Sequence, residues 1–351
     1  MLNKKNTVSG IHIGADTVRV VQMNYHADNE TYRAGSAALS PVQGYFDAEE
    51  RIRNNVQAIN TCKNTIGRKI EKSGFYVTCM NWPDVIVSTF SLPEKSKQEL
   101  ERSLIGEIEQ IYPSDLEKAV IDYHVISREK PEDPQQPARA NGIIAISQQS
   151  SVQNYYSMMR RSGLKSIIID TDSFALLNCF ELLNERRDTA IINVDMSHTI
   201  IAIPRRDSVP FVRNIEYGGK NIINSVVKAK GIEKEDFTDS LQNAKESLSD
   251  DVLEVLKKSC DTLAQNVNRT LQYCLTQDEN LEINHIYITG ELSLMPIIVE
   301  LLSEQMHWTM SQWNPFEKID KKNITGQDLL DKTGSAFAIA AGLSMRRPEY
   351  V

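Results

Sequence analysis

Apolar and polar side chains alternate near the start of the chain in the manner of paired strands. Residues 8–13 alternate, and residues 17–23 are rich in β-branched side chains, which favour strands. Between them stands Gly14-Ala15-Asp16, where glycine tolerates a positive φ and aspartate can hydrogen-bond its own backbone. The pattern predicts a β-hairpin with a tip of small residues.

A related pattern returns much later in the chain. Residues 191–195 predict a strand, Met196-Ser197-His198 a tip, and residues 199–203 a returning strand. In this alignment His12-Ile13-Gly14 lies over Asp195-Met196-Ser197. Two similar hairpins far apart indicate a duplicated fold, and we expect both tips to face one cleft.

The remaining apolar patterns predict alternating strands and helices, because spacings of three and four indicate helices and short β-branched runs indicate strands. The expected helices are 48–74, 95–111, 149–162, 174–183, 219–230, 250–275, 294–306 and 329–346. The expected strands are 31–39, 75–80, 84–90, 120–127, 142–147, 165–170, 209–216 and 282–289. Residues 128–141 are polar, hold three prolines and predict an exposed loop.

The helix expected at 250–275 carries a single apolar seam, made of Leu253, Leu256, Cys260, Leu263, Val267, Leu271 and Cys274. Such a seam suits either a coiled-coil partner or the core of the same chain, and we favour the core. Upstream, residues 84–164 have a strand, helix, strand, strand, helix order of their own. That order predicts a small inserted subdomain.

Composition narrows the class of protein. The 351 residues are 41% hydrophobic and 25% charged, which suits two domains with a substantial core. A net charge of −8 argues against a nucleic-acid binder, although local basic patches stay open. The basic residues 1–5 are not followed by the apolar stretch of a signal peptide, and no window approaches a membrane span of roughly 18–20 apolar residues. We therefore expect a soluble, cytoplasmic protein that reaches a membrane only through another protein.

The cysteines and histidines do not form a metal-binding pattern. The five cysteines include no Cys-x-x-Cys pair, so buried thiols in a reducing compartment are expected instead of disulfides or a zinc site. His12 and His198 could approach each other across the cleft, but no third ligand is visible. No metal site is therefore predicted.

Short motifs spread over nearly the whole chain resemble the PilM family of type IV pilus assembly proteins, which are actin-like relatives of the division protein FtsA. The order and spacing of the motifs carry the resemblance more than any single one. They are residues 10–22, Tyr112-Pro113 with Asp122-Tyr123, and residues 169–176, 211–219, 286–290, 314–316 and 338–346. The resemblance implies an α/β actin-like ATPase fold, built from duplicated RNase-H-like domains with an inserted small α+β subdomain.

The same resemblance places the domain boundaries. The first half comprises residues 1–83 and 165–188, interrupted by the inserted subdomain at 84–164. The second half comprises residues 189–225 and 276–328, interrupted by a helical insert at 226–275. Residues 329–351 form a C-terminal helix that packs back on the first half.

In ATP-binding relatives the two hairpin tips grip the nucleotide phosphates, and the resemblance carries this role to specific positions. The candidate ATP-binding residues are Gly14, Thr17, Asp195, Thr199, Gly218, Gly219 and Gly290. Three interpretations stay open. The glycines can serve only as turn residues, with Asp195 as a helix cap or a buried hydrogen-bonding group; the site can bind ATP without hydrolysing it; or the protein can be an active ATPase.

Several positions depart from the pattern of the ATP-binding relatives. His12 replaces an aspartate that supports magnesium, and imidazole cannot supply the negative charge that this cation prefers. Ser197 and His198 crowd the second tip, while residues 237–241 lack the Glu and Lys that lie near ribose and base in relatives. Glu291 adds a negative charge beside an anionic ligand. We therefore predict a degenerate site with no catalytic residue and no metal, where magnesium ATP binds weakly or not at all.

The resemblance also implies a function. A cytoplasmic scaffold would lie at the inner membrane and bind the N-terminal cytoplasmic peptide of a single-pass partner resembling PilN, in a cleft beside the inserted subdomain, together with other pilus assembly components. The alternatives are a functional ATPase or kinase, a type II secretion component, and a self-associating filament former like FtsA. The chain runs from its last helix directly into residues 346–351, so no membrane-anchoring helix is expected.

Overall fold

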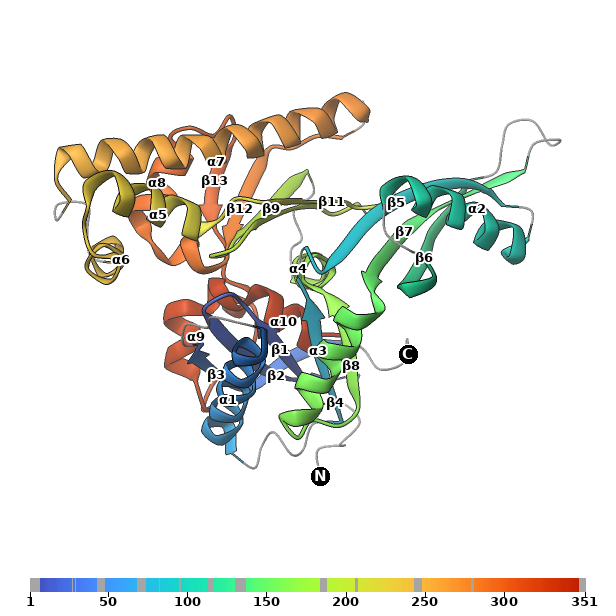
Figure 1. The fold of residues 1–351 in the computed structure, drawn as a ribbon, viewed down its shortest axis with the longest axis horizontal. Helices are drawn as coiled ribbons and strands as arrows, with labels where there is room; N and C mark the ends of the chain where they lie inside the picture. The colour runs from blue at the N-terminus through green and yellow to red at the C-terminus, as the bar shows by residue number, and fades with distance from the viewer. Residues whose placement is uncertain are drawn as a thin grey trace.

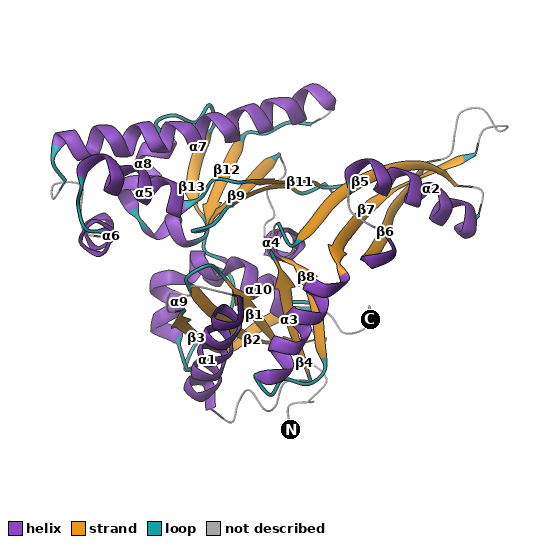
Figure 2. Cartoon of the chain, in the orientation of Figure 1, coloured by secondary structure: helices purple, strands orange, loops and turns teal. Residues whose placement is uncertain are grey.

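The computed structural model describes residues 7–26, 28, 30–42, 48–67, 74–81, 83–94, 96–112, 116–129, 137–183, 188–205, 208–242, 248–278 and 281–346. Within these residues the strands form two five-stranded sheets and one three-stranded sheet. Figure 1 shows the two larger sheets one above the other, with the third sheet projecting to one side. Helices cover the sheets, as the colouring by secondary structure in Figure 2 shows.

The first half is built on the sheet β3-β2-β1-β4-β8. Its strands are β1 (Thr7–Ile13), β2 (Thr17–His26), β3 (Thr31–Pro41), β4 (Phe75–Met80) and β8 (Ile167–Thr171). Strands β1 to β3 pair antiparallel, and β4 and β8 continue the sheet in parallel. On one face, α1 (Ala48–Ile66) and α3 (Gln149–Arg161) bury their apolar side chains against β1 and β2.

The second half repeats this topology in the sheet β11-β10-β9-β12-β13. Its strands are β9 (Thr189–Val194), β10 (Thr199–Ile203), β11 (Phe211–Ile215), β12 (His285–Thr289) and β13 (Thr309–Gln312). Its helices are α5 (Gly219–Lys230), α6 (Lys234–Gln242), α7 (Asp250–Gln277) and α8 (Pro296–Ser303). The matching strand orders confirm the duplicated α/β fold predicted from the two hairpins.

The apolar seam of α7 belongs to the core of the second half. Leu256, Cys260, Leu263, Val267 and Leu271 are each fully buried in one cluster with residues of the sheet and of α5. Leu253 packs against that cluster while partly exposed. The seam therefore packs in the core of its own chain, which is the alternative that we favoured over a coiled-coil partner.

A shared core joins the two halves. It contains α4 (Asp172–Leu183) and α10 (Ala338–Ser344), which pack on β1 and β2 from one side and against Ile191 and Ile200 of the second half from the other. Figure 1 shows both helices between the two sheets. A β-carbon on Gly342 would stand 1.7 Å from the carbonyl oxygen of Ala175, so α10 and α4 approach as closely as backbones allow.

The single helix expected at 329–346 is instead three consecutive pieces. These are α9 (Gln327–Thr333), the 3₁₀ turn η7 (Gly334–Phe337) and α10. The Asn314 side chain lies 2.3 Å from where a β-carbon on Gly334 would stand, so the chain bends where this side chain fills the space beside it. Further short 3₁₀ turns are η3 (Leu116–Lys118), η5 (Glu291–Leu294) and η6 (Pro315–Glu317).

The third sheet, here called the inserted sheet, has the order β5-β7-β6 and is antiparallel. It comprises β5 (Val85–Glu94), β6 (Ala119–Glu129) and β7 (Ala138–Gln148), with α2 (Lys97–Ile111) packed on one face. The prediction of a loop over 128–141 was wrong at both ends. Pairing of Arg128 with Ala140 and of Glu129 with Arg139 extends both strands, and residues 130–136 lie outside the described part.

Two elements escaped the sequence pattern. Helix α6 lies in the polar segment between residues 233 and 249, and only Phe237 and Leu241 of its described side chains are fully buried. Strand β13 is a short edge strand with partly exposed residues and no alternation. The subdomain boundaries stay predictions. The inserted segment that they define includes α3, whose Met158 and Met159 contribute to the first-half core.

Candidate functional site

The two hairpin tips lie next to each other where the halves meet. Gly14 N donates to Thr17 O at 2.8 Å and closes the first tip, and Asp195 N donates to His198 O at 3.2 Å and closes the second. Ala15 of the first tip packs against the core of the second half. The two tips are therefore brought together as predicted, while the cleft expected between them stays a prediction.

Glu291 occupies the space between the tips. It opens the turn η5 directly after β12, and its backbone N–H donates to Asp195 Oδ1 at 3.1 Å. Its Oε1 accepts from Thr17 Oγ1 at 2.7 Å and forms an ion pair with Arg19 Nη2. The carboxylate thus takes the hydroxyl of Thr17, one of the candidate phosphate contacts.

Asp195 is turned into the protein. It is 5% exposed, and its other oxygen accepts from Asn193 Nδ2 at 2.8 Å. Burial alone would raise the pKa of Asp195, but the charge of Arg19, that of His12 when protonated, and the Asn193 hydrogen bond outweigh it, so the pKa is lowered. Asp195 is therefore an ionised, buried hydrogen-bond acceptor in this arrangement.

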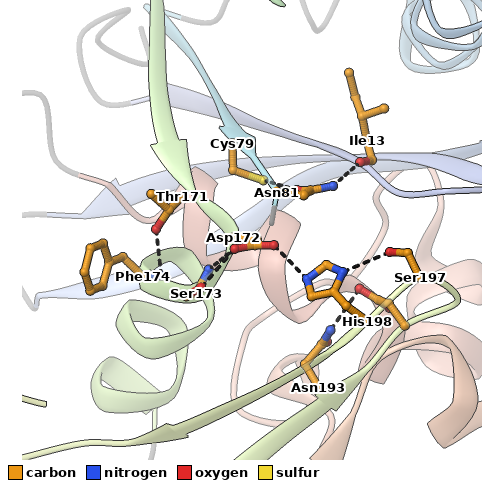
Figure 3. A network of polar contacts seen from close by, with 11 residues as sticks. Ile13, Cys79, Asn81, Thr171, Asp172, Ser173, Phe174, Asn193, Ser197 and His198 are labelled. Carbon is orange, nitrogen blue, oxygen red and sulfur yellow. Dashed lines mark hydrogen bonds and ion pairs between the residues drawn. The ribbon is translucent and has the colours of Figure 1, made fainter. Parts of the chain in front are cut away.

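His198 links the second tip to the first half (Figure 3). Its Nε2 lies 3.0 Å from Asp172 Oδ2, and its Nδ1 lies 2.9 Å from Ser197 Oγ. Burial opposes the charged imidazolium, but the hydrogen bond and charge of Asp172, with the charge of Asp195, raise the pKa of His198. Asp172 lies at the start of α4, where Thr171 caps the helix by accepting from Phe174 N at 3.2 Å.

His12 lies opposite Arg19 in the register of β1 and β2 and is 1% exposed. Its Nδ1 has no hydrogen-bond partner among the residues that the structure describes. Burial is the main cause that lowers its pKa to about 4, with Arg19 adding to the effect and Asp195 opposing it. The ring is therefore neutral near pH 7 and supplies no negative charge for magnesium.

The candidate glycines are needed by the backbone itself. Gly290 has a φ of +92°, and a β-carbon there would stand 2.7 Å from Val194 O. A β-carbon on Gly218 would stand 2.5 Å from Asp195 O and 2.7 Å from His198 N, so α5 begins directly against the second tip. These close approaches require glycine at both positions, whether or not a ligand binds.

The other candidate residues also have partners within the chain. Gly219 N donates to Asp195 O at 2.9 Å, and Thr199 Oγ1 donates to Tyr217 O at 2.7 Å. Lys220 at the start of α5 forms an ion pair of 2.7 Å with Asp16 of the first tip. The sequence-predicted residues are thus brought together, but their polar groups are engaged with one another and with Glu291.

A large cavity lies beside the inserted sheet. Its volume is about 1670 Å³, and its walls come from β6 and β7, from α4, and from the ends of β8, β9 and β10. Among the described residues that line it, none comes from either hairpin tip. Its apolar lining includes Val85, Val120, Ile126, Ile143, Ala145, Phe174 and Leu177.

One face of the inserted sheet is uncovered and forms a wall of this cavity. Helix α2 packs on the face that carries Phe90, Ile144 and Ile146. The opposite face carries alternate residues of β6, from Val120 to Ile126, which line the cavity. Strand β6 is also the edge of the sheet, because β7 is its one neighbour in the strand order. This wall therefore offers both apolar side chains and an unpaired strand edge.

No described helix is long and apolar enough to cross a membrane. Likewise, no group of three or more His, Cys, Asp and Glu side chains in the described residues is arranged to hold a metal ion.

Two five-stranded sheets with the same strand order, whose hairpin tips lie next to each other, define an actin-like ATPase fold. Residues 10–348 match the family described as type IV pilus assembly protein PilM, and the chain belongs to that family.

Solved structures show the same fold at low sequence identity. A PilM–PilN type IV pilus biogenesis complex is 19% identical, with 97% of this chain and 98% of that chain covered and a TM-score of 0.80. A diol dehydratase-reactivating factor in nucleotide-free form is 9% identical, with 96% and 99% covered and a TM-score of 0.56. The ethanolamine utilization protein EutJ from Carboxydothermus hydrogenoformans is 8% identical, with 97% and 89% covered and a TM-score of 0.54.

Proposed function

We propose that this protein is a cytoplasmic scaffold of a type IV pilus assembly machine. It binds the N-terminal cytoplasmic tail of an inner-membrane partner resembling PilN, and its nucleotide site is degenerate. Membership of the PilM family and the fold shared with a PilM–PilN complex support the proposal. The observation that carries it is the bare face of the inserted sheet, which lines a cavity of about 1670 Å³.

The cavity suits an extended peptide for two reasons. Among the described strands only β7 pairs with β6, so a peptide can add to the other edge of β6 by main-chain hydrogen bonds. The apolar side chains of Val120, Ile126 and Phe174 provide surfaces for alternate side chains of that peptide. Main-chain pairing then supplies affinity, and the apolar contacts supply specificity.

Charge favours a basic tail. The two arginines that line the cavity are each paired with an acid, Arg205 with Asp278 and Arg346 with Asp170. Among the described residues of the lining, six acids outnumber these two arginines: Asp122, Asp170, Glu181, Asp188, Asp278 and Glu282. Excess negative charge of this kind steers positively charged partners during association, and cytoplasmic juxtamembrane segments are rich in Lys and Arg.

Two neighbouring residues of β6 provide a matched test of the binding face. Val120 lines the cavity and is 41% exposed, whereas Ile121 is 38% exposed and does not line it. We expect Val120→Lys to weaken binding of the PilN-like N-terminal peptide about tenfold or more, because lysine places a charge where apolar side chains dock. Ile121→Lys introduces the same charge on the opposite face and should leave the affinity unchanged.

The measurement is fluorescence anisotropy of the labelled peptide with both full-length variants, after circular dichroism has shown that they fold. Equal weakening by both substitutions, or by neither, would contradict the placement of the peptide on the bare face.

The degenerate site makes a separate prediction. We expect magnesium ATP to bind weakly or not at all and hydrolysis to be negligible, because His12 is neutral and Glu291 holds Thr17 and Arg19. Isothermal titration calorimetry and a phosphate-release assay measure the two properties. Tight binding that disappears in Asp195→Ala would instead establish a working nucleotide site and favour the ATPase alternative.

A further inference from the structure

Arg19 is a buried cation with unused hydrogen-bonding capacity. It lies on β2, is 2% exposed, and its guanidinium carbon stands 6.0 Å from the centre of the Phe337 ring. Among the described residues only its Nη2 meets an acid, and Nε and Nη1 have no hydrogen-bond partner there. A guanidinium can donate through a fork of five N–H groups, so this one could serve an anion with more oxygens than it now meets.

Glu291 meets this cation through one oxygen. Its Oε1 accepts from both the Thr17 hydroxyl and Arg19 Nη2, while Oε2 is buried and has no hydrogen-bond partner in the described part of the chain. The carboxylate comes from the second half, and both groups that hold it come from the first hairpin. Buried polar groups without a hydrogen bond are costly, and an oxyanion with several acceptor oxygens could satisfy the two unused donors of Arg19 better than this carboxylate does.

We propose that Arg19 and Thr17 form an oxyanion-binding site that the chain fills with its own Glu291 carboxylate, and that this contact clasps the two halves together. The ligand class of the site is a phosphate-like oxyanion. Because Glu291 is held on η5 by its backbone hydrogen bond to Asp195, the carboxylate competes at a high effective concentration. A free anion therefore meets a site that is already occupied, and the halves stay joined without it.

A site that is filled by Glu291 behaves differently from a nucleotide site that is only degenerate. Loss of the acidic residue at position 12 or of the base-binding residues would abolish ATP binding whether or not Glu291 fills the pocket. The clasp instead predicts that removal of one side chain uncovers an anion site. The wild-type titration with ATP tests degeneracy, and the variants below test the clasp, so either can fail alone.

The experiment uses the full chain with Glu291→Gly and magnesium-free inorganic pyrophosphate as the probe. We expect the variant to bind pyrophosphate at least about tenfold more tightly than wild type, because the tethered competitor is gone. The gain should vanish in the double variant Glu291→Gly with Arg19→Met, which keeps an apolar stem beside Phe337. Glu254→Gln removes an acid on α7 away from the site and should behave as wild type.

A second variant and a second measurement cover the case in which Glu291→Gly does not fold. Glu291→Gln keeps the shape of the side chain but abolishes the ion pair, and hydrogen exchange reports on the clasp. We expect the amides of residues 14–19 to exchange about tenfold faster than in Glu254→Gln. Unchanged exchange in folded Glu291→Gln, pyrophosphate binding in folded Glu291→Gly no tighter than in Glu254→Gln, or a gain that survives Arg19→Met would each overturn the proposal.

Discussion

The two buried histidines of the candidate site, His12 and His198, respond to pH in opposite directions. His198 sits beside Asp172, and its pKa is raised, so the stability it contributes is present below the unfolded value of 6.5 and is lost as pH rises through the folded pKa. His12 has a folded pKa of about 4, so the unfolded chain binds its proton first as pH falls. Stability is therefore lost through His12 between pH 6.5 and pH 4.

This difference gives a test at the residue scale. We expect His12→Asn to flatten the acid side of the stability profile by up to about 3 kcal/mol between pH 6.5 and pH 4, because the variant has no ring to protonate in the unfolded chain. Urea unfolding at half-unit pH steps measures it. His198→Asn is the matched comparison and should instead alter the profile above pH 6.5. An unchanged acid slope in His12→Asn would show that other groups cause it.

Single residues also mark where sequence reasoning stopped. The sequence placed a negative charge at Glu291 near the expected anion site, and the structure finds it there. Its partner Arg19 is 272 positions away. In the sequence, Arg19 is one polar residue within the strand predicted at residues 17–23. Nothing local distinguishes a buried ion pair from a solvated charge. Asp172 was missed as a partner of His198 for the same reason.

At the scale of elements, predictions succeeded where burial leaves a clear pattern in the sequence. The seam of α7 buries one side, so its apolar residues recur at fixed spacings. The hairpin strands are buried on both faces, and β-branched residues with small residues at the tips mark them instead. Helix α6 buries little, and β13 forms four pairs with one neighbour, so neither imposes such a pattern. The extended ends of β6 and β7 depend on pairing between strands, which no single segment reveals.

Helix α2 offers a prediction about one such element. Gly106 lies in the exposed middle of α2, and a β-carbon there would meet nothing within 4 Å. Gly106→Ala should stabilise the protein by about 0.5–1 kcal/mol, because alanine has the better helix propensity and less freedom in the unfolded chain. Thermal and urea unfolding followed by circular dichroism measure the change.

Gly142 on β7 is the contrasting position in the same inserted sheet. A β-carbon there would stand 2.2 Å from His124 O and 2.6 Å from a ring carbon of Phe90. Gly142→Ala should therefore destabilise by more than about 1 kcal/mol. Equal effects of the two substitutions would show that α2 is not packed as described.

At the scale of the whole molecule, charge around the cavity predicts how a basic tail associates. The association rate constant of the PilN-like peptide should fall about tenfold between roughly 20 mM and 300 mM salt, while its dissociation rate changes little, because screening weakens steering more than close contacts. Stopped-flow fluorescence measures both rates. Glu282→Gln in the cavity lining should reduce the salt dependence, and Glu254→Gln should not. A salt-independent association rate would contradict electrostatic steering.

The position of α10 sets the order in which the chain can fold during synthesis. Residues 338–344 complete the core over β1, where a β-carbon on Gly10 would stand 2.1 Å from Ala340 O. The sheet and helices of the second half lie within residues 189–312, so they are translated before α10. A nascent chain usually completes its N-terminal domain first. Here the face of β1 that α10 covers can be completed only after residue 344 has emerged from the ribosome.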